Sequence, residues 1–200
     1  MAEYWYVFIV VAFVVIFFGV RIGKGLSKTL ASRRAAVDPL SSVELKIGQK
    51  LELEGKLDKA VIAYSQMIEK YPDCEMAYLF MGYLQRKRRD YDAAAKAFEG
   101  ALKVNPGSVD AMCELGSAML NSGKRKEAGE MFGHVLGLEP QNVEANAFLG
   151  AMHHDSGEIE QAREHLQKAM AAATGMRLTG KMASIVGDVK RRLDQIKDHG

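Results

Sequence analysis

Residues 75–108 read EMAYLFMGYLQRKRRDYDAAAKAFEGALKVNPGS, and their pattern recurs on both sides with a period of 34 residues. Small residues keep this register at Gly48, Gly82, Gly116 and Gly150, and at Ala60, Ala94, Ala128 and Ala162. Large apolar residues keep it at Tyr64, Phe98, Phe132 and Leu166, and prolines keep it at Pro72, Pro106 and Pro140. A period of this length predicts an array in which each repeat is one supersecondary unit stacked on the next.

The positions within one period predict two helices joined by a turn. Glycine and alanine allow two helices to cross closely, and the aromatic residue is expected to fill the space between neighbouring helix pairs. Proline ends the second helix because it has no amide hydrogen and restricts the residue before it. The turn positions hold Gly55, Gly123 and Gly157, with Arg89 as the exception, and this composition suits a residue in the left-handed conformation.

These residues resemble the tetratricopeptide repeat (TPR) family, whose L-G-x2-Y, A-x3-F and terminal proline elements they match over about residues 41–174. The resemblance implies an all-α fold, a solenoid of about four helix-turn-helix repeats. We place the repeats at 43–74, 75–108, 109–142 and 143–174. The fourth is degenerate, because Leu166 and Thr174 replace its aromatic residue and its proline.

An apolar stripe at helical spacing follows the repeats and predicts a C-terminal capping helix at 176–200. Basic residues lie on or near its opposite face: Lys190, Arg191, Arg192 and Lys197. The alternative is a basic amphipathic helix that binds a membrane or another protein.

The first part of the chain has a different composition. Residues 4–20 contain no charge, and a helix of this length spans roughly 26 Å. We therefore predict a transmembrane anchor at 1–22 and a basic tether at 23–42. The residues expected at the membrane interface are Tyr4, Trp5, Tyr6, Arg21 and Lys24.

The positive charges follow the apolar stretch and do not precede it, which disfavours a cleaved secretory signal. By the positive-inside rule they predict a single-pass membrane protein with its N-terminus outside and its TPR domain in the cytoplasm. A bacterial inner membrane is the favoured location and an organelle membrane the alternative. The lipid bilayer is then one predicted partner.

The sequence contains no motif for catalysis, a cofactor or a metal. His153, His154 and His165 are the most suggestive group, but neighbouring histidines on a helix point about 100° apart and do not converge on one ion. Cys74 and Cys113 have no CxxC partner, so we expect free thiols. A net charge of +2 is too small to indicate nucleic-acid binding. We expect no enzyme activity and no cofactor.

By the resemblance, the first helix of each repeat lines the inner face of the solenoid, where a partner binds. The predicted partner-binding groove comprises Leu79, Phe80, Tyr83, Arg86, Lys87, Glu114, Glu144 and Phe148. This groove is aromatic and basic in the second repeat and acidic in the third and fourth.

Some similar TPR domains clamp the C-terminal carboxylate of Hsp70 or Hsp90 chaperones with lysine, arginine and asparagine side chains. The matching positions here hold Leu45, Gln49, Phe80, Asp110 and Glu114. Two acids in place of two cations repel a carboxylate, so no Hsp70 or Hsp90 clamp is predicted.

The groove therefore predicts an extended or helical protein segment as the ligand. The expected function is a membrane-tethered scaffold or assembly factor for a protein partner that is itself membrane-associated. Two alternatives remain open: a targeting or import receptor that binds amphipathic presequences, and a stable accessory subunit of a larger membrane complex.

Overall fold

Helical hairpins stacked in chain order make up most of the computed structural model, which describes residues 42–178 and 180–198. Within these residues there are nine helices and no strand. Four hairpins are formed by α2 (Val43–Leu53) with α3 (Leu57–Lys70), α4 (Glu75–Lys87) with α5 (Tyr91–Val104), α6 (Val109–Asn121) with α7 (Arg125–Leu138), and α8 (Val143–Asp155) with α9 (Ile159–Ala173). The last helix is α10 (Gly180–Asp198).

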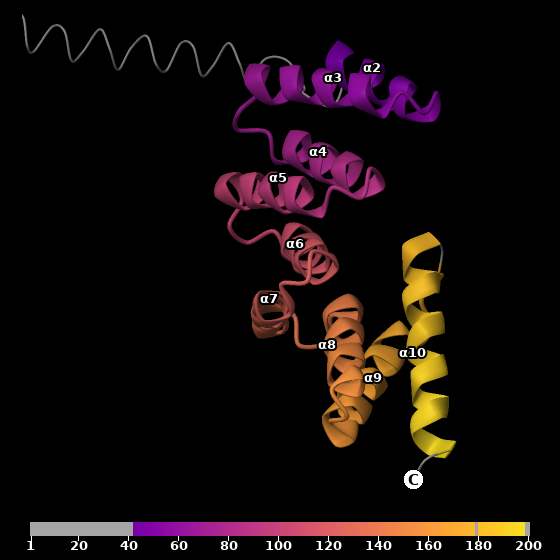
Figure 1. Cartoon of the computed structure of the whole chain (residues 1–200). Helices are drawn as coiled ribbons and strands as arrows, with labels where there is room; N and C mark the ends of the chain where they lie inside the picture. Colours follow the sequence, from indigo (N-terminus) through magenta and orange to yellow (C-terminus); the bar gives the residue numbers. More distant parts are fainter. Residues whose placement is uncertain (1–41, 179, 199–200) are drawn as a thin grey trace, which may run out of the picture.

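The hairpins pack mainly on their neighbours in the sequence. The second helix of each hairpin contacts the first helix of the next, so that α3 lies on α4, α5 on α6 and α7 on α8. Figure 1 shows the resulting curved stack, with α10 running alongside its last part. The predicted all-α solenoid of TPR type is confirmed.

A side chain caps the first helix of three hairpins, whereas Cys74 before α4 makes no capping hydrogen bond. Ser42, Ser108 and Asn142 each accept a hydrogen bond from the backbone amide three residues later, and Asp90 does the same for α5. A cap of this kind contributes about 1 kcal/mol to helix stability. These polar residues therefore help to fix the boundaries of the repeats.

The core of each of the first three hairpins is a glycine packed against a ring, and in the fourth hairpin Gly150 packs against Leu166. A Cβ atom on Gly82 would lie 2.4 Å from Cε1 of Phe98, and one on Gly116 would lie 2.8 Å from Cε1 of Phe132. Both rings are fully buried. The sequence placed the aromatic residue between neighbouring helix pairs, whereas the ring also fills the interior of its own hairpin and requires the glycine opposite it.

The turn between the two helices adopts the predicted left-handed backbone. The φ angle is +71° at Gly55, +84° at Gly123 and +78° at Gly157, and Arg89 takes the equivalent position with φ of +62°. For a residue with a Cβ atom this conformation costs about 1–2 kcal/mol. Arg89 is therefore a strained position in the second hairpin.

Replacing Arg89 with glycine is expected to stabilise the protein by up to about 1 kcal/mol, because relief of this strain outweighs the larger backbone entropy that glycine gains on unfolding. The midpoint of urea unfolding should rise in Arg89→Gly. The reverse change, Gly123→Arg, should lower it by a similar amount. Equal midpoints for wild type and Arg89→Gly would contradict the strain.

The predicted location of the protein needs correction. The proposed anchor at 1–22 and nearly all of the tether at 23–42 fall outside the described residues, as do Tyr4, Trp5, Tyr6, Arg21 and Lys24. In residues 42–178 and 180–198, no helix combines the length and the apolar character needed to cross a membrane. The structure therefore does not support a single-pass membrane protein, and we withdraw that prediction together with its bacterial or organelle location.

Candidate functional site

The last helix covers part of the fourth hairpin. α10 packs against α9 and α8, and it buries Val189 and Ile196 in a cluster with Leu166. The apolar stripe predicted from the sequence is therefore in contact with the array. In Figure 1, the N-terminal end of α10 reaches past α8 toward the level of α6.

Four charged side chains meet where α10 lies over the first helices. Lys181 Nζ of α10 lies 3.0 Å from Oε1 of Glu114 on α6 and forms a second ion pair with Glu144 on α8. Arg86 of α4 donates a hydrogen bond of 2.5 Å to the other oxygen of Glu114. We call Arg86, Glu114, Glu144 and Lys181 the inner charge cluster. It shows that α4, α6 and α8 share one face, the inner face that the resemblance implied.

The acids of this cluster are poorly hydrated. Only 5% of Glu114 is exposed, and the side chain of Glu144 is 12% exposed. Burial raises the pKa of Glu144 above its ordinary value, although the charge and hydrogen bonding of Lys181 oppose the shift. Carboxylates in such positions are costly unless cations pair with them. The inner face is thus built to hold positive charge.

Tyr83 adds an aromatic surface beside this cluster. Its ring meets Phe98 edge to face, with centroids 5.7 Å apart, and the guanidinium of Arg86 lies 5.5 Å from its centroid. Burial, and then the nearby charge of Glu114, raise the pKa of Tyr83 to about 12. The phenol is therefore neutral and able to donate a hydrogen bond at physiological pH.

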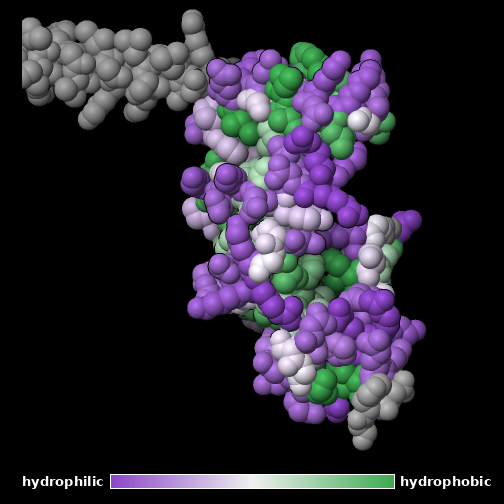
Figure 2. All heavy atoms as spheres, viewed as in Figure 1, coloured by the Kyte–Doolittle hydropathy of each residue, from purple (hydrophilic) through white to green (hydrophobic). Residues whose placement is uncertain are grey.

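A recess lies between α8 and α10. Its volume is about 530 Å³, and its lining includes Leu120, Phe148, Ala151, Met152, Ile185 and Arg192. Figure 2 shows apolar atoms gathered in a hollow between the stacked repeats and α10. Phe148 contributes one edge of the recess and stacks on Phe132, with ring centroids 4.9 Å apart.

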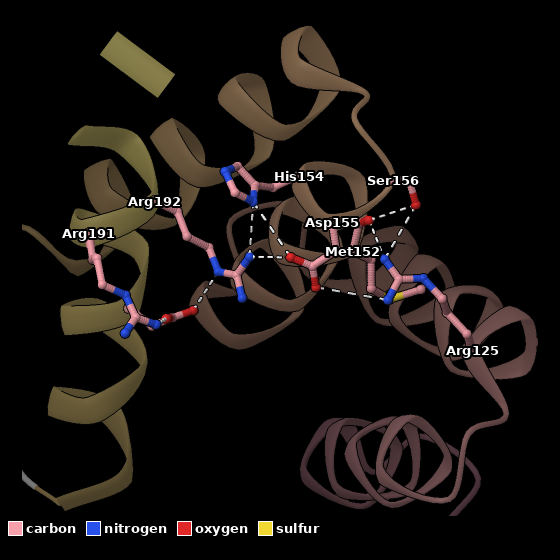
Figure 3. Close-up of polar contacts among 8 residues, drawn as sticks. Arg125, Met152, His154, Asp155, Ser156, Arg191 and Arg192 are labelled. Atoms are coloured by element: carbon pink, nitrogen blue, oxygen red, sulfur yellow. Dashed lines mark hydrogen bonds and ion pairs between the residues drawn. The ribbon is translucent and has the colours of Figure 1, made fainter. Parts of the chain in front are cut away.

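Arg192 fastens α10 to the end of α8. Its guanidinium lies 2.6 Å from Oδ1 of Asp155 and 2.8 Å from Oδ2 of Asp188 (Figure 3). Burial opposes ionisation of Asp155, but the hydrogen bond and charge of Arg192 outweigh it and lower the pKa of that carboxyl. The sequence predicted Arg192 on or near the face opposite the apolar stripe; in the structure its side chain is 19% exposed and pairs with two acids.

The predicted groove residues divide into two groups. Glu114 pairs with both Arg86 and Lys181, and Glu144 pairs with Lys181. Tyr83 contacts Arg86, and Phe148 lines the recess.

The other three predicted residues lie elsewhere. Leu79 is 4% exposed in the core between α4, α5 and α6, so it offers a partner almost no surface. Phe80 stacks on Tyr64 at a centroid distance of 5.9 Å, and Lys87 pairs with Glu52 at 3.6 Å. Phe80 and Lys87 therefore join the first two hairpins.

Lys181 is the member of the inner charge cluster that sequence reasoning missed. It contacts Glu114 across 67 residues of sequence, and it lies outside the repeat register. The signal that points to it is the pair of acids on the inner face, which require a cation when they are buried. Lys181 is the basic residue in the first turn of α10.

Histidines cluster in the fourth hairpin. The rings of His153 and His165 stack with centroids 5.5 Å apart, and Nδ1 of His165 lies 3.0 Å from Oδ1 of Asn146. In the described part of the chain, no group of three or more histidine, cysteine or acidic side chains is arranged to hold a metal ion. Cys74 and Cys113 are free, as expected.

His165 is expected to make the fold sensitive to acid. Burial, and then the charge of His153, lower the pKa of His165 below its ordinary value of 6.5. The folded state thus binds this proton less well than the unfolded chain, so stability is full above about pH 6.5 and falls as the pH drops through the lowered pKa. The free energy of unfolding, measured between pH 7.5 and 5, should decline less in His165→Gln than in wild type. His134→Gln, at an exposed position, should keep the wild-type decline.

Known structures resemble this chain. MamA from Desulfovibrio magneticus RS-1, residues 41 to the end, aligns with a TM-score of 0.62 and 20% identity over 82% of this chain and 92% of MamA. YrrB, described as a TPR protein with an unusual peptide-binding site, aligns with a TM-score of 0.53 and 16% identity over 78% of this chain and 89% of YrrB. At these identities the likeness establishes the fold.

Sequence relatives agree with that fold. The peroxisomal targeting signal receptor of Candida glabrata is 29% identical over 131 residues, which are 60% of this chain and 22% of the receptor. The chain thus spans about a fifth of the length of this relative. Tetratricopeptide repeat family models match residues 43–73, 79–132 and 122–175. These matches together cover more than half of the chain, which belongs to the tetratricopeptide repeat family.

Proposed function

We propose that this protein is a scaffold that binds a segment of a partner protein on the inner face of α4, α6 and α8. TPR solenoids present extended concave surfaces for this purpose. The observation that carries the proposal is the pair of poorly hydrated acids, Glu114 and Glu144, on the inner face of successive hairpins. Stability does not explain acids at these positions, because apolar residues of similar size would avoid the free-energy cost of removing a charge from water.

The geometry supports a ligand with both charge and apolar groups. Tyr83 provides an aromatic surface beside Arg86 of the inner charge cluster, and Phe148 provides a second one in the recess between α8 and α10. Two or three apolar anchors that contribute about 1.5–3 kcal/mol each, set against an association cost of about 4 kcal/mol or more, give micromolar affinity. Such affinity suits a scaffold that exchanges its partners.

Affinity capture of the full chain from its native cells tests this function. Quantitative mass spectrometry should recover at least one protein that is depleted about ten-fold or more with a Tyr83→Ala, Phe148→Ala variant, a loss of about 1.4 kcal/mol. Ile62→Ala, which removes an exposed side chain on α3, is the matched control and should retain the same protein. Circular dichroism must show that the double variant is folded. Recovery that is unchanged in a folded double variant would contradict binding on the inner face.

A second candidate function is a receptor for a targeting signal, as the name of the Candida glabrata relative suggests. Under that reading, the captured proteins would be numerous and would share one short sequence motif. A scaffold would recover one protein or a few that lack a common motif. The same capture experiment therefore separates the two functions.

A further inference from the structure

The two halves of α10 are held differently. The C-terminal half buries Val189 and Ile196, which are 1% and 4% exposed. The N-terminal half presents Met182, Ile185 and Val186, and these side chains are only partly buried. Ser184 and Ile185 of this half line the recess of about 530 Å³, which Asp188 and Arg192 of the C-terminal half also line. The first two turns of α10 are thus the weakly attached part.

Gly187 separates the two halves. A Cβ atom at this position would meet no other atom within 4 Å, so packing does not require a glycine there. Glycine in the interior of a helix weakens it relative to alanine. The sequence therefore places a weak point where the loosely packed turns join the anchored ones.

The strongest polar contact of the loose half is Lys181 with two acids from different hairpins. Glu114 and Glu144 both pair with its ammonium group. The lysine itself is 39% exposed, whereas the acids it pairs with are 7% and 12% exposed. The acids lie on α6 and α8 of the array, and the cation lies on the weakly attached half of α10.

We propose that the surface under residues 180–187 is a docking site for a helical segment of a partner protein that carries a lysine or arginine. The partner's helix displaces the first two turns of α10, and its cation takes the place of Lys181 between Glu114 and Glu144. Its apolar side chains enter the recess beside Phe148. This inference rests on the proposed function, because it takes the inner face as the binding surface and names the chemistry of the ligand.

Charge complementarity and the present occupant both support this choice of partner. The two acids select a cation, and α10 itself demonstrates that a helix with a lysine fits this surface. α10 then acts as an internal competitor. Removing its cation should increase the population of the open inner face, and apparent affinity rises in proportion to that population.

Hydrogen exchange tests whether the first turns form a separate unit. In the full chain, the amides of residues 183–187 should exchange at least ten-fold faster than those of 189–196. Lys181→Ala should accelerate exchange at 183–187 only, and Lys197→Ala, which removes an exposed lysine near the other end of α10, should change neither set. Equal rates for the two halves in the wild-type protein would overturn the inference.

Binding of a defined peptide tests the choice of ligand. The probe is a fluorescein-labelled peptide with the sequence of residues 180–198, and its anisotropy is followed as the full chain is added. Lys181→Ala should bind it about ten-fold more tightly than wild type, and adding Glu114→Gln and Glu144→Gln should remove that gain. Gly187→Ala should bind more weakly than wild type because its first turns are held more firmly.

A control peptide with glutamate in place of the residue that corresponds to Lys181, and otherwise identical to the lysine peptide, separates charge recognition from general helix binding. It should bind wild type and Lys181→Ala at least ten-fold more weakly than the lysine peptide, whereas the variant that also carries Glu114→Gln and Glu144→Gln should bind the two peptides equally. Equal binding of the two peptides to wild type and Lys181→Ala, or equal affinity of wild type and Lys181→Ala for the lysine peptide, would overturn the inference. Either failure leaves the proposed function standing if affinity capture still recovers a protein that depends on Tyr83 and Phe148.

Discussion

Phe98→Ala is expected to lower the free energy of unfolding by about 3–5 kcal/mol, the range found when a fully buried phenylalanine is truncated. Phe98 fills the interior of the second hairpin against Gly82, and it meets the ring of Tyr83 at 5.7 Å. Glycine provides no side chain that would move into the cavity. The lost contacts therefore have no replacement from the facing helix.

Urea unfolding followed by circular dichroism measures this effect. Leu53→Ala is the control, because its side chain is 89% exposed and its removal should change stability by less than about 0.5 kcal/mol. Similar midpoints for Phe98→Ala and Leu53→Ala would show that the hairpin closes around the missing ring. The glycine–ring contact would then be unimportant for stability.

Glu114→Gln is expected to cost about 2 kcal/mol. The change preserves the shape of the side chain but leaves Arg86 and Lys181 facing a neutral amide. Removing one charge from a buried pair destabilises a protein more than removing one from an exposed surface pair. Both cations here are partly exposed, so the loss of stability should be smaller than in a fully buried network. Thermal or urea unfolding at pH 7 gives the value.

Glu144→Gln provides the contrast, since it alters an acid with the same ion-pair partner. Burial raises the pKa of Glu144, so its ionised form is disfavoured in the folded protein. Protonated Glu144 contributes its whole stabilisation below the pKa of the unfolded chain, about 4.5. This contribution is lost as the pH rises through the higher pKa of the folded protein. At pH 7, Glu144→Gln should therefore be close to neutral or stabilising.

Comparing the two variants at pH 7 and pH 4 checks the assignment. Relative to wild type, Glu144→Gln should be less favourable at pH 4 than at pH 7. If both variants lose the same free energy at pH 7, then Glu114 is not the centre of the inner charge cluster.

The sequence predicted the hairpins because the contacts that define them lie within one period. Gly82 and Phe98 are close in sequence, and the same pair of positions recurs in each repeat, so the pattern reports directly on packing. The turn at Arg89 was also predictable, since the other three repeats carry glycine there. Local and repeated interactions are visible in a single sequence.

The inner face was only partly predictable. Arg86 belongs to the inner charge cluster and Tyr83 contacts it, yet Leu79, one turn from Tyr83, is buried by α5 and α6. Which side of a helix is covered depends on the angle at which the next hairpin stacks, and the repeat pattern does not encode that angle. Lys181 was missed because α10 lies outside the repeats, and where it docks depends on the assembled surface of α8 and α9.

In a solenoid each hairpin contacts only its neighbours, so the stiffness of the array depends on many small interfaces in series. The C-terminal half of α10 adds to the last of these interfaces, because Val189 and Ile196 are buried against the fourth hairpin and Arg192 pairs with Asp155 at the end of α8. We expect these contacts to make the fourth hairpin more resistant to bending than the hairpins of α2 to α5. Tension along the array is therefore expected to extend those first hairpins before the fourth.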